Sequence, residues 1–289
     1  MAKHNFPALN AGALVDTRDA CHAYASVLGG WTTACRQRRK HWWQLSLRPS
    51  LNGVTTGVIH ADGAHFELAL DLANNHARGE IAGVGQFSEV LGGQTAAELG
   101  NAIQEFLLGG GIDPKFLPGG GADDGHEALD GSVRAGYSAE IAAGFAQTWR
   151  ELSAAYTKFQ AGTPEETSPI NVWPGHFDMA MMWLGGEKIP GQDPANEEYS
   201  DKQMNFGFSF GDAGIPEPYF YITAYPLPDA FPGLVLPGSA YWHSAGFNGV
   251  VLRYADLIER QDPQGALLEL WHCLLDAGRQ HMLENTGRV

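Results

Sequence analysis

Apolar side chains between residues 20 and 35 recur at helical spacing, which predicts a first helix along this stretch. Asp16 or Thr17 is expected to cap its start, because both residue types are good N-caps. Four cations follow the stripe, and they are Arg36, Arg38, Arg39 and Lys40. Cations at a helix C-terminus complement its macrodipole, so this explanation is favoured over the alternative of an anion-binding site.

Three more helices are predicted from their capping residues and apolar stripes. Thr95 and Glu98 form the T-x-x-E pattern of a capping box. Ser138 precedes a second helical stripe and is a suitable cap. The last helix is expected to begin at Asp262, with Pro263 in the favoured first position.

Alternation of apolar and polar residues predicts strands between these helices. In the first half they are expected over residues 42–47, 54–60 and 65–72, the last with a clean alternation. Asn74 and Asn75 suit a hairpin turn, because asparagine tolerates positive φ. In the second half, strands are predicted over residues 170–184, 204–210, 219–225 and 249–254.

This order of elements predicts an α+β fold with antiparallel sheets flanked by helices. Each half of the chain has the order helix, strands, helix, so two similar halves are expected within a single compact unit, residues 1–289. The halves are residues 1–118 and 137–289, joined by a glycine-rich loop over residues 119–136. The acids of this loop are Asp123, Asp124, Glu127 and Asp130, and their spacing does not match an EF-hand.

Charge and composition narrow the class of protein. The chain of 289 residues carries 33 acidic and 18 basic residues, a net charge of −15. Such a charge disfavours nucleic acid and anionic membranes as partners. Three cysteines without a C-x-x-C pair fit a reducing compartment, so a soluble, cytoplasmic protein is expected. The sequence leaves the cofactor and the oligomeric state undefined and assigns no metal-binding residue.

Several short motifs are distinctive when they are taken together. They are His41-Trp42-Trp43, Thr55-Thr56, Trp173 followed by Gly175-x-Phe177-Asp178, and a proline-tyrosine run that begins at Glu217-Pro218. This combination resembles a bacterial family known as domain of unknown function 5996. The resemblance runs from about Asp16 to Met282 and implies no activity, substrate or catalytic residue. The family pattern often has a histidine after a Tyr-Ser pair, where this chain has Asp201.

His176 and Asp178 are the candidate catalytic residues. If they lie in a strand, their i, i+2 spacing places both side chains on one face, opposite Phe177. A carboxylate beside an imidazole can orient a general base, or a histidine can begin a metal site. The alternative is a structural hydrogen bond to backbone or solvent.

Ser209 lies in the sequence Gly-Phe-Ser-Phe-Gly, which matches the G-x-S-x-G pattern of a serine-hydrolase nucleophile elbow. That chemistry requires the serine on a sharp turn from a strand into a helix. Here the flanking residues alternate as a strand, and glycines and prolines follow. We therefore expect Ser209 to lie on the polar side of a strand.

A third group of polar residues lies on the strand predicted over residues 65–72. His65, Glu67 and Asp71 share its polar face and offer acid–base chemistry or a hard-cation site. A solvated sheet face is the simpler interpretation.

Aromatic residues are concentrated in the second half. Residues 170–254 hold 16 aromatic side chains and only three lysines and arginines, which favours a cleft for a neutral or cationic ligand. The candidate ligand-binding residues are Trp42, Trp173, Tyr199, Asp201 and Tyr221. The chain is therefore expected to be a small-molecule-binding protein or enzyme. A metal-assisted or serine hydrolase and a non-catalytic interaction protein remain as alternatives.

Overall fold

The computed structural model describes residues 6–61, 63–113, 132, 134 and 136–283. The chain divides into two compact units. The N-terminal unit is Leu9–Arg150 with Asn171–Asp178, and the C-terminal unit is Met1–Ala8, Glu151–Ile170 and Met179–Val289. The predicted joining loop, residues 119–136, lies outside the described residues except for 132, 134 and 136, and its four acids lie outside them altogether. The expectation of a single unit with two halves stays a prediction.

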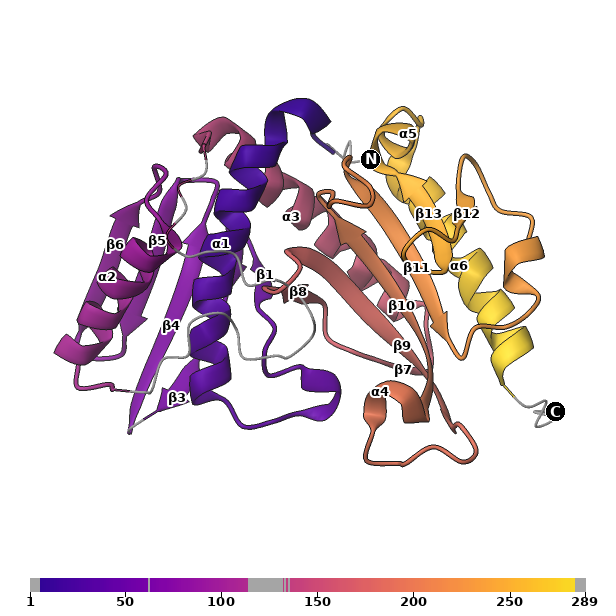
Figure 1. Ribbon diagram of the computed structural model, residues 1–289, viewed down its shortest axis with the longest axis horizontal. Coiled ribbons are helices and arrows are strands. Elements are labelled where there is room, and N and C mark those ends of the chain that lie inside the picture. The colour runs from indigo at the N-terminus through magenta and orange to yellow at the C-terminus, as the bar shows by residue number, and fades with distance from the viewer. Residues whose placement is uncertain (1–5, 62, 114–131, 133, 135, 284–289) are drawn as a thin grey trace. The chain divides into compact units, whose positions relative to one another are not determined.

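The N-terminal unit contains an antiparallel sheet in the order β1-β2-β4-β5-β6, with β3 paired to β4 (Figure 1). Its strands are β1 (Arg48–Ser50), β2 (Gly53–Thr55), β3 (Ile59–Ala61), β4 (Ala64–Asp71), β5 (His76–Ile81) and β6 (Gly85–Val90). Its other elements are α1 (Ala11–Cys35), η1 (Lys40–Trp42), α2 (Ala96–Gly109), the first part of α3 (Ala139–Ala161) and β8 (Asn171–Trp173).

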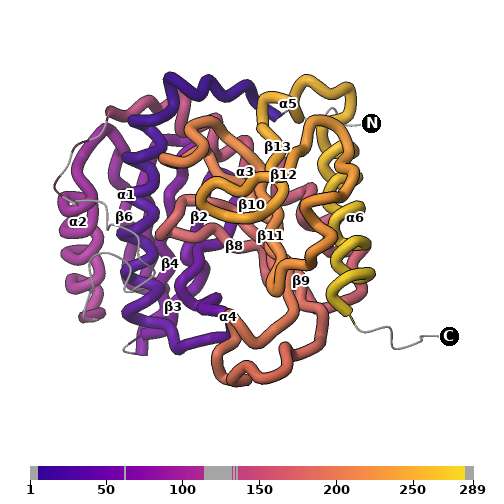
Figure 2. The backbone as a smooth tube through the Cα atoms, turned by 45° about the vertical axis from the view of Figure 1, so that its right-hand side comes forward, coloured from indigo at the N-terminus to yellow at the C-terminus, as the bar shows by residue number. Residues whose placement is uncertain are grey.

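One face of this sheet is covered by α1 and α2, which lie side by side (Figures 1 and 2). The alternation predicted for residues 65–72 is confirmed, because Phe66, Leu68 and Leu70 of β4 are buried. Gly79 of β5 allows a close approach, since a Cβ atom there would lie 3.0 Å from the ring of Phe106 on α2. Asn75 has the positive φ expected of the hairpin turn between β4 and β5.

The first helix differs from the prediction at both ends. It begins at Ala11, where the Asn10 side chain accepts a hydrogen bond from the Gly12 amide at 3.1 Å, and not near Asp16 or Thr17. The Thr17 hydroxyl instead accepts a bond from the amide of Ser138. The helix ends at Cys35, and no basic residue lies in its last turn. The four cations follow the helix directly, with Arg36 as its C-cap, so the macrodipole explanation stays a prediction.

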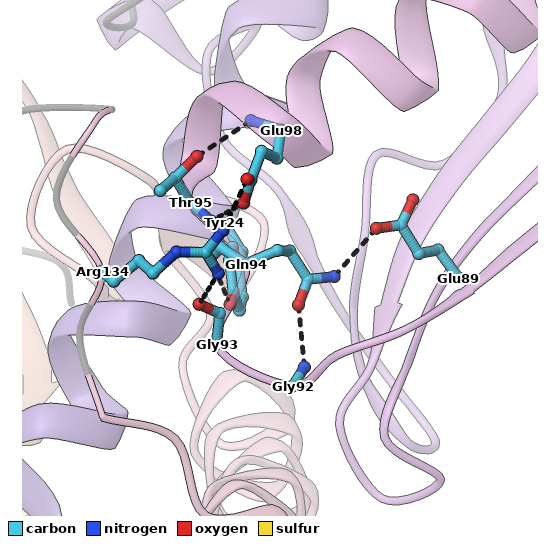
Figure 3. A network of polar contacts seen from close by, with 8 residues as sticks. All are labelled: Tyr24, Glu89, Gly92, Gly93, Gln94, Thr95, Glu98 and Arg134. Atoms are coloured by element: carbon cyan, nitrogen blue, oxygen red, sulfur yellow. Dashed lines mark hydrogen bonds and ion pairs between the residues drawn. The ribbon is translucent and has the colours of Figure 1, made fainter.

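A polar network joins α1 to the start of α2 (Figure 3). The Tyr24 hydroxyl on α1 donates to the Gln94 carbonyl at 2.8 Å. The predicted capping box is confirmed, with Thr95 and Glu98 each bonded to the other's backbone amide. Arg134 donates to the Glu98 carboxylate and to the Gly93 carbonyl, so the network holds three separate segments at the helix N-terminus.

The strand predicted over residues 42–47 is wrong. His41 and Trp42 have φ angles of 49° and 59°, and the chain forms a short 3-10 helix and a turn before β1 begins at Arg48. The strand predicted over residues 54–60 is interrupted, because Gly57 with φ of 65° separates β2 from β3. In both places a backbone turn replaces regular pairing.

The C-terminal unit contains the second antiparallel sheet, in the order β12-β13-β11-β10-β9-β7. Its strands are β7 (Glu166–Thr167), β9 (Asp178–Lys188), β10 (Asp201–Ser209), β11 (Tyr219–Tyr225), β12 (Tyr241–His243) and β13 (Gly249–Arg253). The remaining elements are the end of α3, α4 (Glu197–Ser200), η2 (Phe231–Gly233), α5 (Tyr254–Ile258) and α6 (Pro263–Met282).

One face of this sheet packs against the helices of its own unit. The Trp271 ring of α6 stacks on Tyr156 of α3 at 4.5 Å and contacts Phe206 of β10. The Tyr156 hydroxyl lies within 3.0 Å of the Phe206 carbonyl, which satisfies a polar group in an apolar core. The predicted start of the last helix is confirmed, since Asp262 caps α6 and Pro263 follows.

The α+β class and the antiparallel sheets flanked by helices are thus confirmed, while the similarity of two halves stays a prediction. Among the helices of the described residues, none is both long enough and apolar enough to span a bilayer.

Candidate functional site

The two candidate catalytic residues lie in a turn and not along one strand. Trp173 ends β8, residues 174–177 form a turn, and β9 begins only at Asp178. Phe177 has a φ of 56°, so the side-chain alternation of a strand does not apply here. The prediction that His176 and Asp178 share a strand face is therefore wrong. His176 is exposed, whereas Asp178 is buried.

Helix α1 holds this turn in place. The His22 ring donates from Nε2 to the Gly175 carbonyl at 3.0 Å, and the Ser26 hydroxyl donates to the Pro174 carbonyl at 3.0 Å. The Phe177 ring stacks on His22 with centroids 5.9 Å apart. A carbonyl acceptor requires the proton on Nε2, so the neutral form of His22 is held in a single tautomer.

Burial, together with the charge of the nearby His176, lowers the pKa of His22 to about 4, although the bond to Gly175 opposes this shift. His22 is not among the candidate residues predicted from the sequence. The pattern that identifies it is the spacing of His22, Ser26 and Gly29 at i, i+4 and i+7, which places polar or small residues on one face of an otherwise apolar helix. These are the positions that contact the turn.

The two predicted ligand-binding tryptophans lie in the N-terminal unit. Trp42 is half exposed, and the Arg38 guanidinium lies 4.7 Å from its ring centroid in a cation–π contact. Trp173 is half-buried, and its carbonyl accepts the amide of Phe177 at 2.8 Å. Trp42 thus already contacts a cation, and Trp173 closes the turn described above.

The other three predicted ligand-binding residues lie in the C-terminal unit. Asp201 is buried at the start of β10 and forms an ion pair of 2.6 Å with Lys188. Tyr199 is exposed, and its ring meets that of Tyr225 edge to face at 5.3 Å. Asp201 therefore has a structural partner, whereas Tyr199 lies beside the tyrosine row of β11, to which Tyr221 belongs.

Side-chain alternation along β11 gathers aromatic rings on the face of the sheet opposite α6. Tyr221 pairs with Gly207 on β10 and with Val251 on β13, and Val251 pairs in turn with Tyr241 on β12. Phe247 packs against the same group. We define the aromatic face as Tyr199, Tyr219, Tyr221, Tyr225, Tyr241, His243 and Phe247.

Acidic side chains lie at the end of the aromatic face near Tyr219. The Tyr219 hydroxyl donates to the Asp212 carboxylate at 2.5 Å, and the amide of Ile215 donates to the same carboxylate at 2.8 Å. Glu217 forms an ion pair of 2.9 Å with Arg253, which raises the pKa of that arginine. The charge of Arg253 is thereby neutralised, and Asp212 contributes a negative charge near the rings.

Ser209 lacks the geometry of a nucleophile elbow, as predicted. It is the last residue of β10 and is 6% exposed, and its Oγ accepts the amide of Gly211 at 3.1 Å. Gly211 has a φ of 100°, and the chain then continues to β11 without an intervening helix. No helix N-terminus is therefore available to activate this hydroxyl.

The polar residues of β4 make separate local bonds. The Nδ1 atoms of His65 and His60 lie 2.7 Å apart in a hydrogen bond, and Asp71 accepts from Arg78 at 2.7 Å. Glu67 accepts from the hydroxyl of Thr55. Within the part of the chain that the structure describes, no group of three or more histidine, cysteine, aspartate or glutamate side chains is arranged to hold a metal ion.

A small pocket of about 140 Å³ lies in the C-terminal unit between β13, α5 and α6. It contains none of the residues singled out from the sequence. Its lining is Pro237, Gly238, Ser239, Leu252, Leu257, Arg260, Ala266, Glu269 and Leu270.

Comparison with known proteins identifies a family but no activity. A family model described as a family of unknown function, DUF5996, matches residues 6–282, nearly the whole chain. Neither a curated protein nor a solved structure matches the sequence.

Proposed function

The chain belongs to the DUF5996 family of unknown function, and we propose that it binds a neutral or cationic small molecule on the aromatic face of its C-terminal unit. The observation that carries this proposal is the position of Tyr221, whose ring lies across Gly207 in the middle of the sheet. The half-buried rings of Tyr241 and Phe247 pack in the same cluster as Tyr221.

The chemistry of the aromatic face favours this class of ligand. The face of an aromatic ring carries negative electrostatic potential, so it attracts cations and accommodates neutral rings. Asp212 adds a negative charge, and the Arg253 cation is paired with Glu217. Phosphate esters are disfavoured at such a surface because no unpaired cation is found among its described residues.

The proposal concerns binding and does not extend to catalysis. Ser209 offers no elbow geometry, which argues against the serine-hydrolase alternative. All three cysteines are free thiols, which supports a reducing, cytoplasmic location. The net charge of −15 supports partners other than nucleic acid or anionic membrane.

A matched series of probes tests the proposal by thermal unfolding. Benzylamine, benzyl alcohol and benzyl phosphate share one ring and differ in charge. A ligand that binds only the folded state raises the unfolding temperature in a saturable way. We expect benzylamine and benzyl alcohol to do so, with a response that Tyr221→Leu and Tyr241→Leu weaken.

Phe87→Leu is the control, because Phe87 is a half-buried aromatic residue on β6 of the other unit. It should leave the response to benzylamine unchanged. An unchanged response in Tyr221→Leu, or a response to benzyl phosphate alone, would contradict the proposal.

A further inference from the structure

Two arginines of separate segments, Arg36 and Arg48, come together in the N-terminal unit, and the charge of a third, Arg39, acts on both of them. Arg36 is the C-cap of α1, Arg39 follows three residues later, and Arg48 begins β1. The Arg36 Nη1 donates to the Ser46 carbonyl at 3.4 Å, and the Arg48 Nη1 donates to the Ser46 hydroxyl at 2.7 Å. Two guanidinium groups therefore contact the same residue, Ser46. We call Arg36, Arg39 and Arg48 the arginine cluster.

We propose that the arginine cluster binds a small oxyanion group, of which inorganic phosphate is the simplest example. The site is separate from the aromatic face, and the inference does not depend on the proposed function.

The two half-buried arginines are held in fixed positions. Arg36 donates through Nη2 to the Thr56 carbonyl, and Arg48 donates through Nη1 to the Asn171 side chain. Every Arg48 hydrogen bond found within the described residues runs through Nη1. The Nη2 and Nε groups of Arg48 remain as donors, and this is the fork with which a guanidinium binds a phosphate or carboxylate.

No acid found among the described residues forms an ion pair with the arginine cluster, although acids outnumber bases 33 to 18 in the chain overall. Burial and the nearby Arg36 and Arg39 lower the pKa of Arg48 to about 10. Like charges held together in a half-buried position are unfavourable, and a bound anion relieves this repulsion.

A purely structural role explains less of this arrangement. Arg36 and Arg48 satisfy the carbonyl of Thr56 and the side chains of Ser46 and Asn171. Neutral donors can make such bonds without the repulsion. Arg39 is exposed, and its charge contributes to the repulsion. An anion site explains why all three cations are present together.

The test compares phosphate with chloride at equal ionic strength, using thermal unfolding and titration calorimetry of the whole protein. We expect one phosphate per chain to bind in a saturable way and to raise the unfolding temperature. Arg39→Gln should weaken phosphate binding by on the order of tenfold, the loss expected for one charge-assisted contact. In chloride alone, it should keep or raise the unfolding temperature, because it removes repulsion.

Arg38→Gln is the matched control, since Arg38 is an exposed arginine of the same segment that contacts Trp42. It should leave the dissociation constant of phosphate unchanged. Acetate and a phosphate monoester, tested in parallel, show whether the site prefers carboxylate or phosphate and whether it accepts a substituted phosphate. Tyr221→Leu should not alter phosphate binding, so this inference and the proposed function fail independently.

Two results would overturn the inference. One is the absence of a saturable phosphate response in the unmodified protein. The other is an equal loss of binding in Arg39→Gln and Arg38→Gln, which would indicate a general effect of surface charge.

Discussion

The ring of Tyr221 on β11 occupies the space above Gly207 on the neighbouring strand β10. A Cβ atom at position 207 would lie 2.0 Å from the ring carbon that bears the hydroxyl, so only glycine fits beneath this side chain. An aromatic ring that covers a glycine on an adjacent strand shields the backbone and fixes the register of the pair. The position of the Tyr221 ring in the aromatic face thus depends on Gly207 having no side chain.

Gly207→Ala is therefore expected to displace the Tyr221 ring and to destabilise the protein by roughly 1–3 kcal/mol, the usual cost of overpacking. Denaturant unfolding measures this free energy. Gly85→Ala is the control, because a Cβ atom on Gly85 of β6 meets no atom within 4 Å. Equal stability of the two variants would show that the ring moves aside at no cost. The double variant Gly207→Ala with Tyr221→Ala should recover part of the loss.

Gly29 on α1 has a similar relationship with Pro174 in the turn before β9. A Cβ atom on Gly29 would lie 2.6 Å from the proline ring. Alanine is normally the better helix former by up to about 1 kcal/mol, but we expect Gly29→Ala to lower the free energy of unfolding by roughly 1–3 kcal/mol. Gly109→Ala in the last turn of α2 has open space and should be neutral or stabilising. Stabilisation in both variants would argue that Pro174 is not held against the helix.

Elements with short-range determinants could be predicted from the sequence. The alternation of β4 needs only the residues of that strand, and the Thr95 and Asp262 caps lie within one turn of the amides they bond. Residues 42–47 show the limit of this approach. Their alternation resembles a strand, but the backbone turns at His41 and Trp42, where neither glycine nor asparagine indicates a positive φ.

The predicted geometry of the candidate residues was wrong where residues from distant segments meet. The tyrosine row of β11 was identified because it lies within one strand, but its partner Gly207 comes from β10. The proximity of Arg48 and Asn171 to Arg36 could not be predicted, because these residues belong to other segments. The i, i+2 argument for His176 failed for a related reason. The turn that contains it depends on bonds from α1, which lies about 150 residues earlier in the chain.

Ser209 is expected to be unreactive. Its hydroxyl is buried at the end of β10 and accepts the amide of Gly211, and no histidine–carboxylate pair bonded to it is found among the described residues. A fluorophosphonate probe, which labels activated serines, should leave it unmodified, and peptide mass spectrometry checks the site directly. A covalent adduct on Ser209 would contradict this prediction and revive the serine-hydrolase alternative.

His22 makes the stability of the N-terminal unit dependent on pH. Its pKa falls from 6.5 to about 4, mainly because burial disfavours the charged imidazole. Between these values the unfolded chain binds a proton that the folded protein does not, so stability decreases as the pH falls from 6.5 towards 4. Above pH 6.5 the His22 imidazole is neutral in both the folded and the unfolded state, so this residue no longer changes the free energy of unfolding with pH. The shift corresponds to at most roughly 3 kcal/mol, and solvent screening of the half-buried ring reduces this value.

His22→Gln should remove this dependence, because glutamine can still donate to the Gly175 carbonyl but does not titrate. We expect the free energy of unfolding, measured with denaturant at pH 7.5 and pH 4.5, to decrease less in His22→Gln than in the unmodified protein. Carboxylates that titrate in this range are present in both proteins, so their contributions cancel in the comparison. His281→Gln alters an exposed histidine of α6 and is the control. If both histidine variants lose stability in parallel with the unmodified protein, His22 is not held neutral and the turn at Gly175 does not depend on its tautomer.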